Sequence, residues 1–425
     1  MRFSFAISFF FALSTILPAQ NQSYTTVIEG FDWGAAVSKV IVPIDSTIQS
    51  LEGADFEVSV TRSTDCAEMN ERWKNGERKV MYAYTSDAQG KRTEKGKFAT
   101  LVLFVAPFEG IGSPMQYFAN EKCPGNAWVD YNMRIIHKKS QRIWRNESYR
   151  MMPLVDQFDV SRKYIYKDGR RFAYADFKPT NKKGKSPLVI WLHGGGEGGN
   201  DPTVALMANR AANYAAPEIQ AYFGGAYVLV PQCPGAWMHN TEGRITWGAE
   251  DDVYHKPLMA LIKDYVKRHP NIDEDRIYLG GCFNGGYMTI KLMLEHPDYF
   301  AAGFPSALAY KSEYLSDAQI KTLSKQPIWF IHSEDDPVTP AATTVVPVYE
   351  RLMKANAKNI HFSYFDHVVD ITRVFGGENY HYNGHFSWIY SHTNNCFYDY
   401  DGQPVLVDEK PVSLMEWMAA QKREK

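Results

Sequence analysis

The stretch R-I-Y-L-G-G-C-F-N-G-G-Y-M-T-I, residues 276–290, decides how the rest of the chain is interpreted. The apolar run 277–279 predicts a strand, and the glycines that follow predict a sharp turn into a helix. Gly281 and Gly285 suit that turn, because a side chain there would collide where strand and helix pass closely. A strand, tight turn and helix are the context of the G-x-S-x-G motif, whose serine is a nucleophile at the tip of the turn. Here the tip residue is Phe283, so the functional interpretation depends on that position.

A second glycine-rich run, H-G-G-G-E-G-G at 193–199, follows an apolar stretch at 188–192. The continuous apolar character of 188–192 predicts a strand that is buried on both faces. Glycines in the loop after such a strand leave backbone N–H groups free to face an oxygen that becomes negatively charged during a reaction. Because this loop follows a buried strand and precedes the 276–290 stretch, the sequence favours an oxyanion loop over a flexible turn.

A candidate acid and a candidate base follow later in the chain. The apolar run 328–331 leads into H-S-E-D-D-P-V, and a carboxylate just past a late strand is well placed to orient a histidine. Asp336 is the preferred acid because of its D-P-V context, and Asp335 is the alternative. In the run Y-N-G-H-F-S-W, His385 is the candidate general base, and His381 is its nearby competitor.

The pattern of strands, helices and turns divides the chain into five segments. Residues 1–19 resemble a secretory signal peptide. Short alternating runs over 20–139 predict an antiparallel β-sandwich. We expect it to have a structural role in covering, orienting or lengthening the second domain, and a dedicated ligand-binding role is the alternative. Residues 140–159 are interpreted as a linker. Alternating strands and helices over 160–395 predict a mostly parallel sheet flanked by helices, and 396–425 form a C-terminal extension.

Composition restricts the classes of function. The 425 residues are 45% hydrophobic and 22% charged, as in an ordinary globular protein. A formal net charge of -2 gives no electrostatic reason to expect nucleic acid as a partner. Apart from the short run within 1–19, no segment is long and apolar enough to predict a membrane span. We therefore expect a secreted protein whose mature chain starts near Gln20.

The five cysteines are compatible with disulfide formation in an exported protein. Cys66 and Cys123 lie in the first half of the chain and are available to pair. Cys233, Cys282 and Cys396 lie in the second half, so one of these three is expected to stay free. The pairing itself is not determined by the sequence.

Two tryptophans, Trp237 and Trp247, follow the predicted strand 227–230. They are candidates to line a substrate cleft, and packing in the core is the equal alternative. No Cys/His group has the spacing of zinc ligands, and no Walker-type phosphate loop is present. The sequence thus predicts neither a metal nor another cofactor.

With HGGGEGG, GCFNGG, EDDPV and GHFSW in this order, residues 160–395 resemble an α/β-hydrolase. The chain is similar to secreted esterases with an Ig-like N-terminal domain and to the feruloyl-esterase and polyhydroxybutyrate-depolymerase-like group. The G-G-Y-x-T continuation is also similar to that of prolyl-oligopeptidase-family peptidases. The resemblance implies a carboxylic ester as substrate, either small or polymer-linked, and leaves the oligomeric state open. It also implies Asp336 as acid, His385 as base, and the backbone N–H groups of Gly195 and Asn284 as the oxyanion hole.

The chain departs from these families at Phe283, since phenylalanine has no nucleophilic atom to start acyl-enzyme chemistry. Three interpretations remain open. Cys282 could act as the nucleophile of a shifted turn, although that places Asn284 where a glycine is needed. The chain could instead be a non-catalytic relative that binds a ligand or partner in the cleft. Alternatively, Phe283 is a recent replacement in an otherwise complete site.

Overall fold

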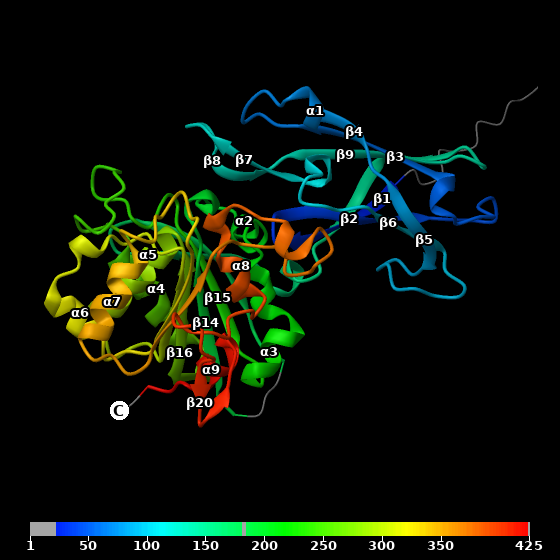
Figure 1. The fold of residues 1–425 in the computed structure, drawn as a ribbon. Helices are drawn as coiled ribbons and strands as arrows, with labels where there is room; N and C mark the ends of the chain where they lie inside the picture. The colour runs from blue at the N-terminus through cyan, green and yellow to red at the C-terminus, as the bar shows by residue number, and fades with distance from the viewer. Residues whose placement is uncertain (1–22, 181–183, 424–425) are drawn as a thin grey trace, which may run out of the picture.

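The computed structural model describes residues 23–180 and 184–423. The predicted signal peptide at 1–19 lies outside these residues. The N-terminal part is a β-sandwich that lies across one end of a larger α/β domain (Figure 1). None of the helices that the described residues form combines the length and apolar character needed to cross a membrane.

The sandwich consists of two sheets and a projecting hairpin. Its strands alternate between buried and exposed side chains, as in β3, where Val58 and Val60 point into the core. A disulfide joins Cys66 to Cys123, the pair available from the sequence. The five-stranded sheet runs in the order β11 (Asn146–Met151), β1 (Ser23–Phe31), β2 (Gly34–Pro43), β6 (Phe98–Leu103) and β5 (Val80–Ser86). The four-stranded sheet runs β10 (Arg142–Trp144), β9 (Asp130–His137), β3 (Phe56–Ser63) and β4 (Asn75–Glu77), and the hairpin pairs β7 (Met115–Ala119) with β8 (Pro124–Trp128).

The predicted linker at 140–159 is wrong over residues 142–151. β10 pairs with β9, and β11 pairs in parallel with β1, so both strands belong to the sandwich. β11 is an edge strand whose first four side chains are exposed. It therefore lacks the alternation of apolar and polar residues by which a half-buried strand is recognised.

The α/β domain is built on one eight-stranded sheet. The last six strands in sheet order are parallel, and the first two add an antiparallel edge. Every residue of β14 is buried, as its apolar run predicts. The order is β12 (Asp159–Ile165), β13 (Arg171–Phe177), β15 (Tyr227–Gln232), β14 (Ser186–Leu192), β16 (Ile272–Cys282), β17 (Ala302–Ser306), β18 (Ile328–Ser333) and β19 (Ile360–Phe365).

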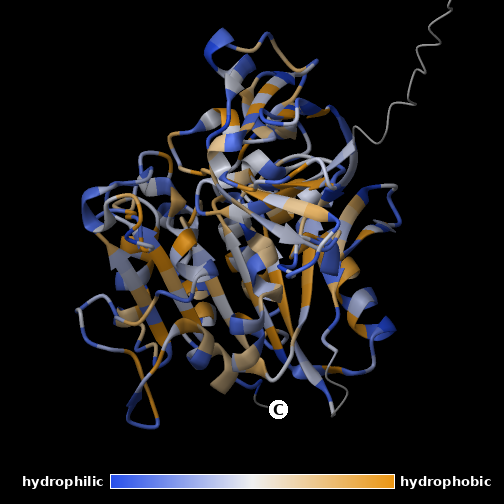
Figure 2. Cartoon of the chain, turned by 90° about the vertical axis from the view of Figure 1, so that its right-hand side faces the viewer, coloured by the Kyte–Doolittle hydropathy of each residue, from blue (hydrophilic) through white to orange (hydrophobic). Residues whose placement is uncertain are grey.

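Helices cover both faces of this sheet (Figure 1). On one face lie α4 (His255–Arg268), α5 (Asn284–Glu295), α6 (Asp317–Leu323) and α7 (Val345–Lys354). On the other lie α2 (Pro202–Met207), α3 (Pro217–Phe223), α8 (Trp388–His392) and α9 (Leu414–Ala420), whose core is continuous with that of the sandwich. Apolar residues gather along the central strands in Figure 2, as this burial requires. The sandwich adds only the short α1 (Glu71–Lys74).

The segment predicted as a C-terminal extension is part of the packed α/β domain. A two-stranded ribbon of β20 (Leu406–Val407) and β21 (Lys410–Pro411) leads into α9. Trp417 of α9 is 1% exposed, and its ring packs edge-on against Trp329 of β18. The last helix therefore closes one face of the central sheet.

Candidate active site

The predicted strand–turn–helix forms at the junction of β16 and α5. Phe283 is the single residue between them, with φ 54° and ψ -115°. Such a backbone conformation is strained for a residue with a side chain, and strain of this kind is concentrated at functional sites. The Phe283 N–H donates to the carbonyl of Ser306 at 3.1 Å. The turn thus presents the residue at its tip in the manner of a nucleophile elbow.

His385 and Asp336 form a hydrogen-bonded pair beside this turn. The Nδ1 atom of His385 lies 2.9 Å and 3.1 Å from the two carboxylate oxygens of Asp336. Asp336 is 4% exposed and also accepts hydrogen bonds from the backbone of Val338 and Thr339. Burial alone would raise the pKa of Asp336, but the hydrogen bonds from His385 and Thr339 outweigh it and hold that pKa at about 2. The carboxylate is thereby kept ionised next to the imidazole.

The alternative acid, Asp335, and the alternative base, His381, have other partners. Asp335 contacts Nδ1 of His367 at 2.8 Å. His381 is exposed, and its Nε2 atom lies 3.0 Å from the carbonyl of Glu378. The structure brings Asp336 and His385 together and gives Asp335 and His381 other partners.

The side chain of Phe283 occupies the space in front of the histidine. Its ring meets the His385 imidazole edge to face, with centroids 5.1 Å apart. The ring centroid of Trp247 lies 6.1 Å from that of Phe283, and Trp247 is partly buried against the core of the α/β domain. The His–Asp pair therefore faces an aromatic ring in place of a hydroxyl or thiol.

The glycine-rich loop lies against the same turn. A Cβ atom added to Gly195 would come within 3.2 Å of the Phe283 ring and 3.3 Å of Nδ2 of Asn284. Asn284 begins α5 and is fully buried, and its side-chain amide has no hydrogen-bond partner among the described residues. The two residues predicted as oxyanion donors are therefore close to each other, and both are close to Phe283.

Cys282 is poorly suited to replace the missing nucleophile. It is 0% exposed and lies beneath the glycine-rich loop, where Nδ2 of Asn209 approaches its sulfur at 3.5 Å. Burial and the nearby carboxyl of Glu197 raise the pKa of the Cys282 thiol well above its ordinary value. A buried thiol with a raised pKa is unreactive, since the thiolate is the nucleophilic form. All three cysteines of the α/β domain are free, against the expectation of one.

Trp237 does not line the cleft. It is 0% exposed, stacks on Phe172, and donates from Nε1 to the carbonyl of His193 at 3.1 Å. The His193 side chain in turn accepts from the backbone N–H of Cys233, and burial lowers the pKa of His193 to about 4. Trp237 and Cys233 therefore hydrogen-bond to His193 at the start of the glycine-rich loop. Sequence pattern could not separate this role from cleft lining, because both use an aromatic residue after a strand.

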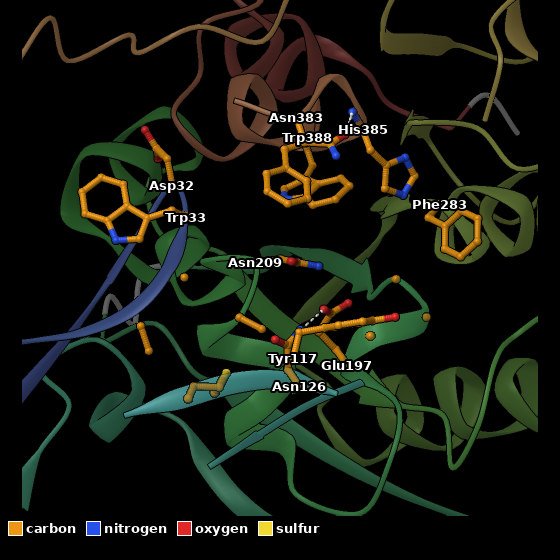
Figure 3. A pocket seen from close by; sticks show the side chains of 18 of the residues that line it. Asp32, Trp33, Tyr117, Asn126, Glu197, Asn209, Phe283, Asn383, His385 and Trp388 are labelled. Carbon is orange, nitrogen blue, oxygen red and sulfur yellow. Dashed lines mark hydrogen bonds between the residues drawn. The ribbon is translucent and has the colours of Figure 1, made fainter. Parts of the chain in front are cut away.

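A cavity of about 650 Å³, here called the interdomain pocket, opens in front of the turn (Figure 3). The sandwich contributes Trp33, Met115, Tyr117 and Asn126 to its wall, and the α/β domain contributes Phe283, His385, Phe386 and Trp388. The sandwich therefore covers one side of the pocket, which is compatible with both of the roles expected for it. The volume suits a ligand of ordinary small-molecule size.

The β7–β8 hairpin holds the sandwich on the oxyanion loop. Gly125 has φ +115°, and a Cβ there would stand 2.5 Å from the carbonyl oxygen of Gly196. Next to this contact, Nδ2 of Asn126 donates to the buried carboxyl of Glu197 at 2.8 Å. Burial raises the pKa of Glu197 to about 7, against the lowering effect of hydrogen bonds from Asn126 and Asn209. Sequence reasoning passed over Glu197, although its place inside HGGGEGG was a usable signal.

One further group in the described part of the chain has the arrangement of possible metal ligands, namely Asp251, Asp252 and His255. Its carboxylates already have partners, since Nζ of Lys291 lies 2.6 Å from Asp251 and the hydroxyl of Tyr287 lies 3.0 Å from Asp252. An ammonium group in that position competes with a metal ion for the same oxygens. We therefore assign no metal site there.

Comparisons with known proteins agree with this architecture. Residues 23–150 match the family model "Esterase Ig-like N-terminal domain", and residues 179–370 match the model "Phospholipase/Carboxylesterase". Together the two matches support an α/β-hydrolase esterase. The predicted fold class, an all-β Ig-like sandwich followed by an α/β-hydrolase domain, is confirmed.

The individual relatives of this chain are distant. NocK of Nocardia uniformis subsp. tsuyamanensis, named as an esterase, is 27% identical over 44% of this chain and 52% of its own length. Poly(3-hydroxyalkanoate) depolymerase C of Paucimonas lemoignei is 28% identical over 30% of this chain and 29% of its own. The chain thus spans about half or less of these curated relatives. A thermostable esterase has the same fold, with a TM-score of 0.72 and 24% identity over 94% of this chain and 100% of its own.

Proposed function

We propose that this chain binds carboxylic esters in the interdomain pocket and does not hydrolyse them through an acyl-enzyme, because Phe283 stands at the nucleophile position. The observation that carries the proposal is the phenyl ring 5.1 Å from the His385 imidazole, beside an intact His385–Asp336 pair. The pocket, the oxyanion loop and the acid–base pair are all retained around a residue that cannot attack a carbonyl.

The chemistry that the site lacks can be stated step by step. In a serine enzyme, the histidine takes the hydroxyl proton while the oxygen bonds to the ester carbon, and the aspartate stabilises the imidazolium. Here His385 has the geometry to take a proton, and Asp336 has the geometry to stabilise the imidazolium. The N–H groups of Gly195 and Asn284 would face the oxyanion. The attack on the ester carbon has no atom to perform it, so the remaining groups serve to hold an ester rather than to cleave it.

Turnover in the unmodified chain tests this proposal. The unmodified protein and its His385→Ala and Cys282→Ala variants are expected to release p-nitrophenol from p-nitrophenyl acetate at the same low rate, since His385 has no nucleophile to activate. A rate that falls in His385→Ala would show that the site turns over without serine. A rate that falls in Cys282→Ala would make Cys282 the nucleophile.

Binding is tested by calorimetric titration with a neutral ester, 3,3-dimethylbutyl acetate. Val338 lines the interdomain pocket and is 41% exposed, so Val338→Trp fills the pocket without disturbing the core. We expect this change to weaken binding by about tenfold or more, because the occupied volume excludes the ligand. The matched control is Ile165→Trp, on the exposed side of edge strand β12. Equal affinity in the two variants would contradict ester binding in this pocket.

We also propose that the chain is exported. The pattern of residues 1–19 supports this proposal, and so does the Cys66–Cys123 disulfide, a bond that persists in oxidising compartments. Expression in a secreting host should yield a mature chain that starts near Gln20, as read by N-terminal sequencing. An unprocessed chain retained inside the cell would contradict export.

A further inference from the structure

We infer that the interdomain pocket prefers esters that carry a cationic alkylammonium group over neutral esters of the same shape. The inference rests on the proposed function, since it names the class of ester that the same pocket takes. Its support comes from two carboxyl side chains in the pocket wall, from the absence of Lys and Arg among the described lining residues, and from aromatic rings around the cavity.

Glu197 is the first of these carboxyl groups. It lines the pocket, is 4% exposed, and accepts a hydrogen bond from Asn126 at 2.8 Å. Asn209 and the N–H of Gly194 also donate to it, so its described partners are neutral amides and not a cation. Burial without a positive partner raises the pKa of Glu197 to about 7. A ligand cation in the pocket would supply the missing countercharge.

Asp32 is the second carboxyl group, on the sandwich side of the pocket (Figure 3). Arg210 pairs with its Oδ1 atom at 2.7 Å, whereas its Oδ2 atom is buried and has no hydrogen-bond partner among the described residues. Burial raises the pKa of Asp32, the Arg210 charge lowers it, and the nearby Asp370 carboxylate raises it again. Asp32 therefore keeps one buried carboxylate oxygen without a described partner, in spite of the ion pair.

The rest of the pocket wall suits an alkylammonium group. Its rings are those of Trp33, Tyr117, Phe283, Phe386 and Trp388, and a quaternary ammonium group binds favourably against the faces of such rings. In Figure 3, Tyr117 and Glu197 lie on the same side of the pocket. This combination of rings and carboxyl groups would repel a ligand carboxylate or phosphate, because no lining Lys or Arg could pair with it.

The experiment uses the unmodified full-length protein and two esters that differ only in charge. Acetylcholine and 3,3-dimethylbutyl acetate have the same shape, with nitrogen in one replaced by carbon in the other. Titration calorimetry at about pH 8.5, where the Glu197 carboxyl is ionised, is expected to show acetylcholine binding about tenfold more tightly. At about pH 5.5 the Glu197 carboxyl is protonated, and the ratio of the two affinities should fall.

Neutral groups surround the Glu197 carboxyl. They are the amides of Asn126 and Asn209, the N–H of Gly194, and the thiol of Cys282, whose raised pKa keeps it neutral over this range. His385 lines the same pocket. The Glu197→Gln variant shows how much the Glu197 carboxyl contributes to the ratio of affinities. It should bring the ratio of affinities at about pH 8.5 close to its value at about pH 5.5.

Glu218→Gln is the matched control, because it removes the same charge from an exposed position on α3. It should leave the affinity ratio as it is in the unmodified protein. Equal binding of the two esters, or tighter binding of the neutral one, would overturn the inference and leave ester binding itself intact. Failure of both esters to bind at millimolar concentration would overturn the proposed function together with it. An unchanged ratio in Glu197→Gln would show that the Glu197 carboxyl does not attract the cation, and it would overturn the inference.

Discussion

Replacing Phe283 with serine is expected to raise the kcat for p-nitrophenyl acetate by at least about 10⁴-fold, because removal of a serine nucleophile from such a triad costs about 10⁶-fold. The strained turn already presents residue 283 towards His385, and Asp336 already orients that imidazole. Serine is smaller than phenylalanine, so the substitution adds a hydroxyl and frees space at once. The measurement is the rate of p-nitrophenol release, together with an initial burst that reports the acyl-enzyme.

Two control variants separate the effect of the added hydroxyl group from the effect of the freed volume. Phe283→Ala empties the same volume without adding a nucleophile and should stay at the rate of the unmodified chain. Phe283→Ser combined with His385→Ala should lose the gained activity, because the serine then has no base. Equal activity in Phe283→Ala and Phe283→Ser would mean that water attacks directly. A Phe283→Ser variant without esterase activity would mean that the oxyanion loop or the pocket no longer positions an ester for attack.

The α/β domain and its site could be predicted because their signals are local in the sequence. A buried strand such as β14 is a continuous apolar run, and the loop that follows it lies at the carboxyl edge of the sheet in any parallel arrangement. The candidate site residues follow strands or lie near the end of the domain, and the carboxyl edge of the sheet brings them together. They are Gly195, Phe283, Asp336 and His385. Their convergence follows from chain order and sheet topology, both of which can be derived from the sequence pattern.

The parts that were missed depend on contacts between distant segments. Tyr117 and Asn126 belong to an unremarkable hairpin, and only the docking of the sandwich makes them neighbours of Glu197. Trp237 follows a strand as a cleft residue would, yet its ring packs beneath the loop instead of beside the pocket. Hydrophobic periodicity reports which face of an element is buried, but it does not report what buries that face.

The substitution Gly285→Ala is expected to destabilise the protein more than any other single methyl group added near the site. A Cβ at Gly285 would stand 2.1 Å from the carbonyl oxygen of Leu192 and 2.6 Å from that of His193. Both atoms belong to the backbone at the end of β14, so neither can move aside as a flexible side chain would. We expect a loss of about 3 kcal/mol in the free energy of unfolding, seen as a fall of roughly 5–10 °C in Tm.

Gly169→Ala is the matched control, since Gly169 has φ +90° in the β12–β13 turn and nothing lies within 4 Å of an added Cβ. Backbone strain alone makes that change cost roughly 1–2 kcal/mol. The difference between the two variants therefore measures the collision at Gly285.

The same substitution should also affect activity, because His193 is the first residue of the predicted oxyanion loop. In the Phe283→Ser background, Gly285→Ala should reduce esterase activity in the protein that remains folded. A Gly285→Ala protein as stable as Gly169→Ala, with full activity in that background, would show that the close approach of α5 to β14 is not needed to hold the turn and the loop together.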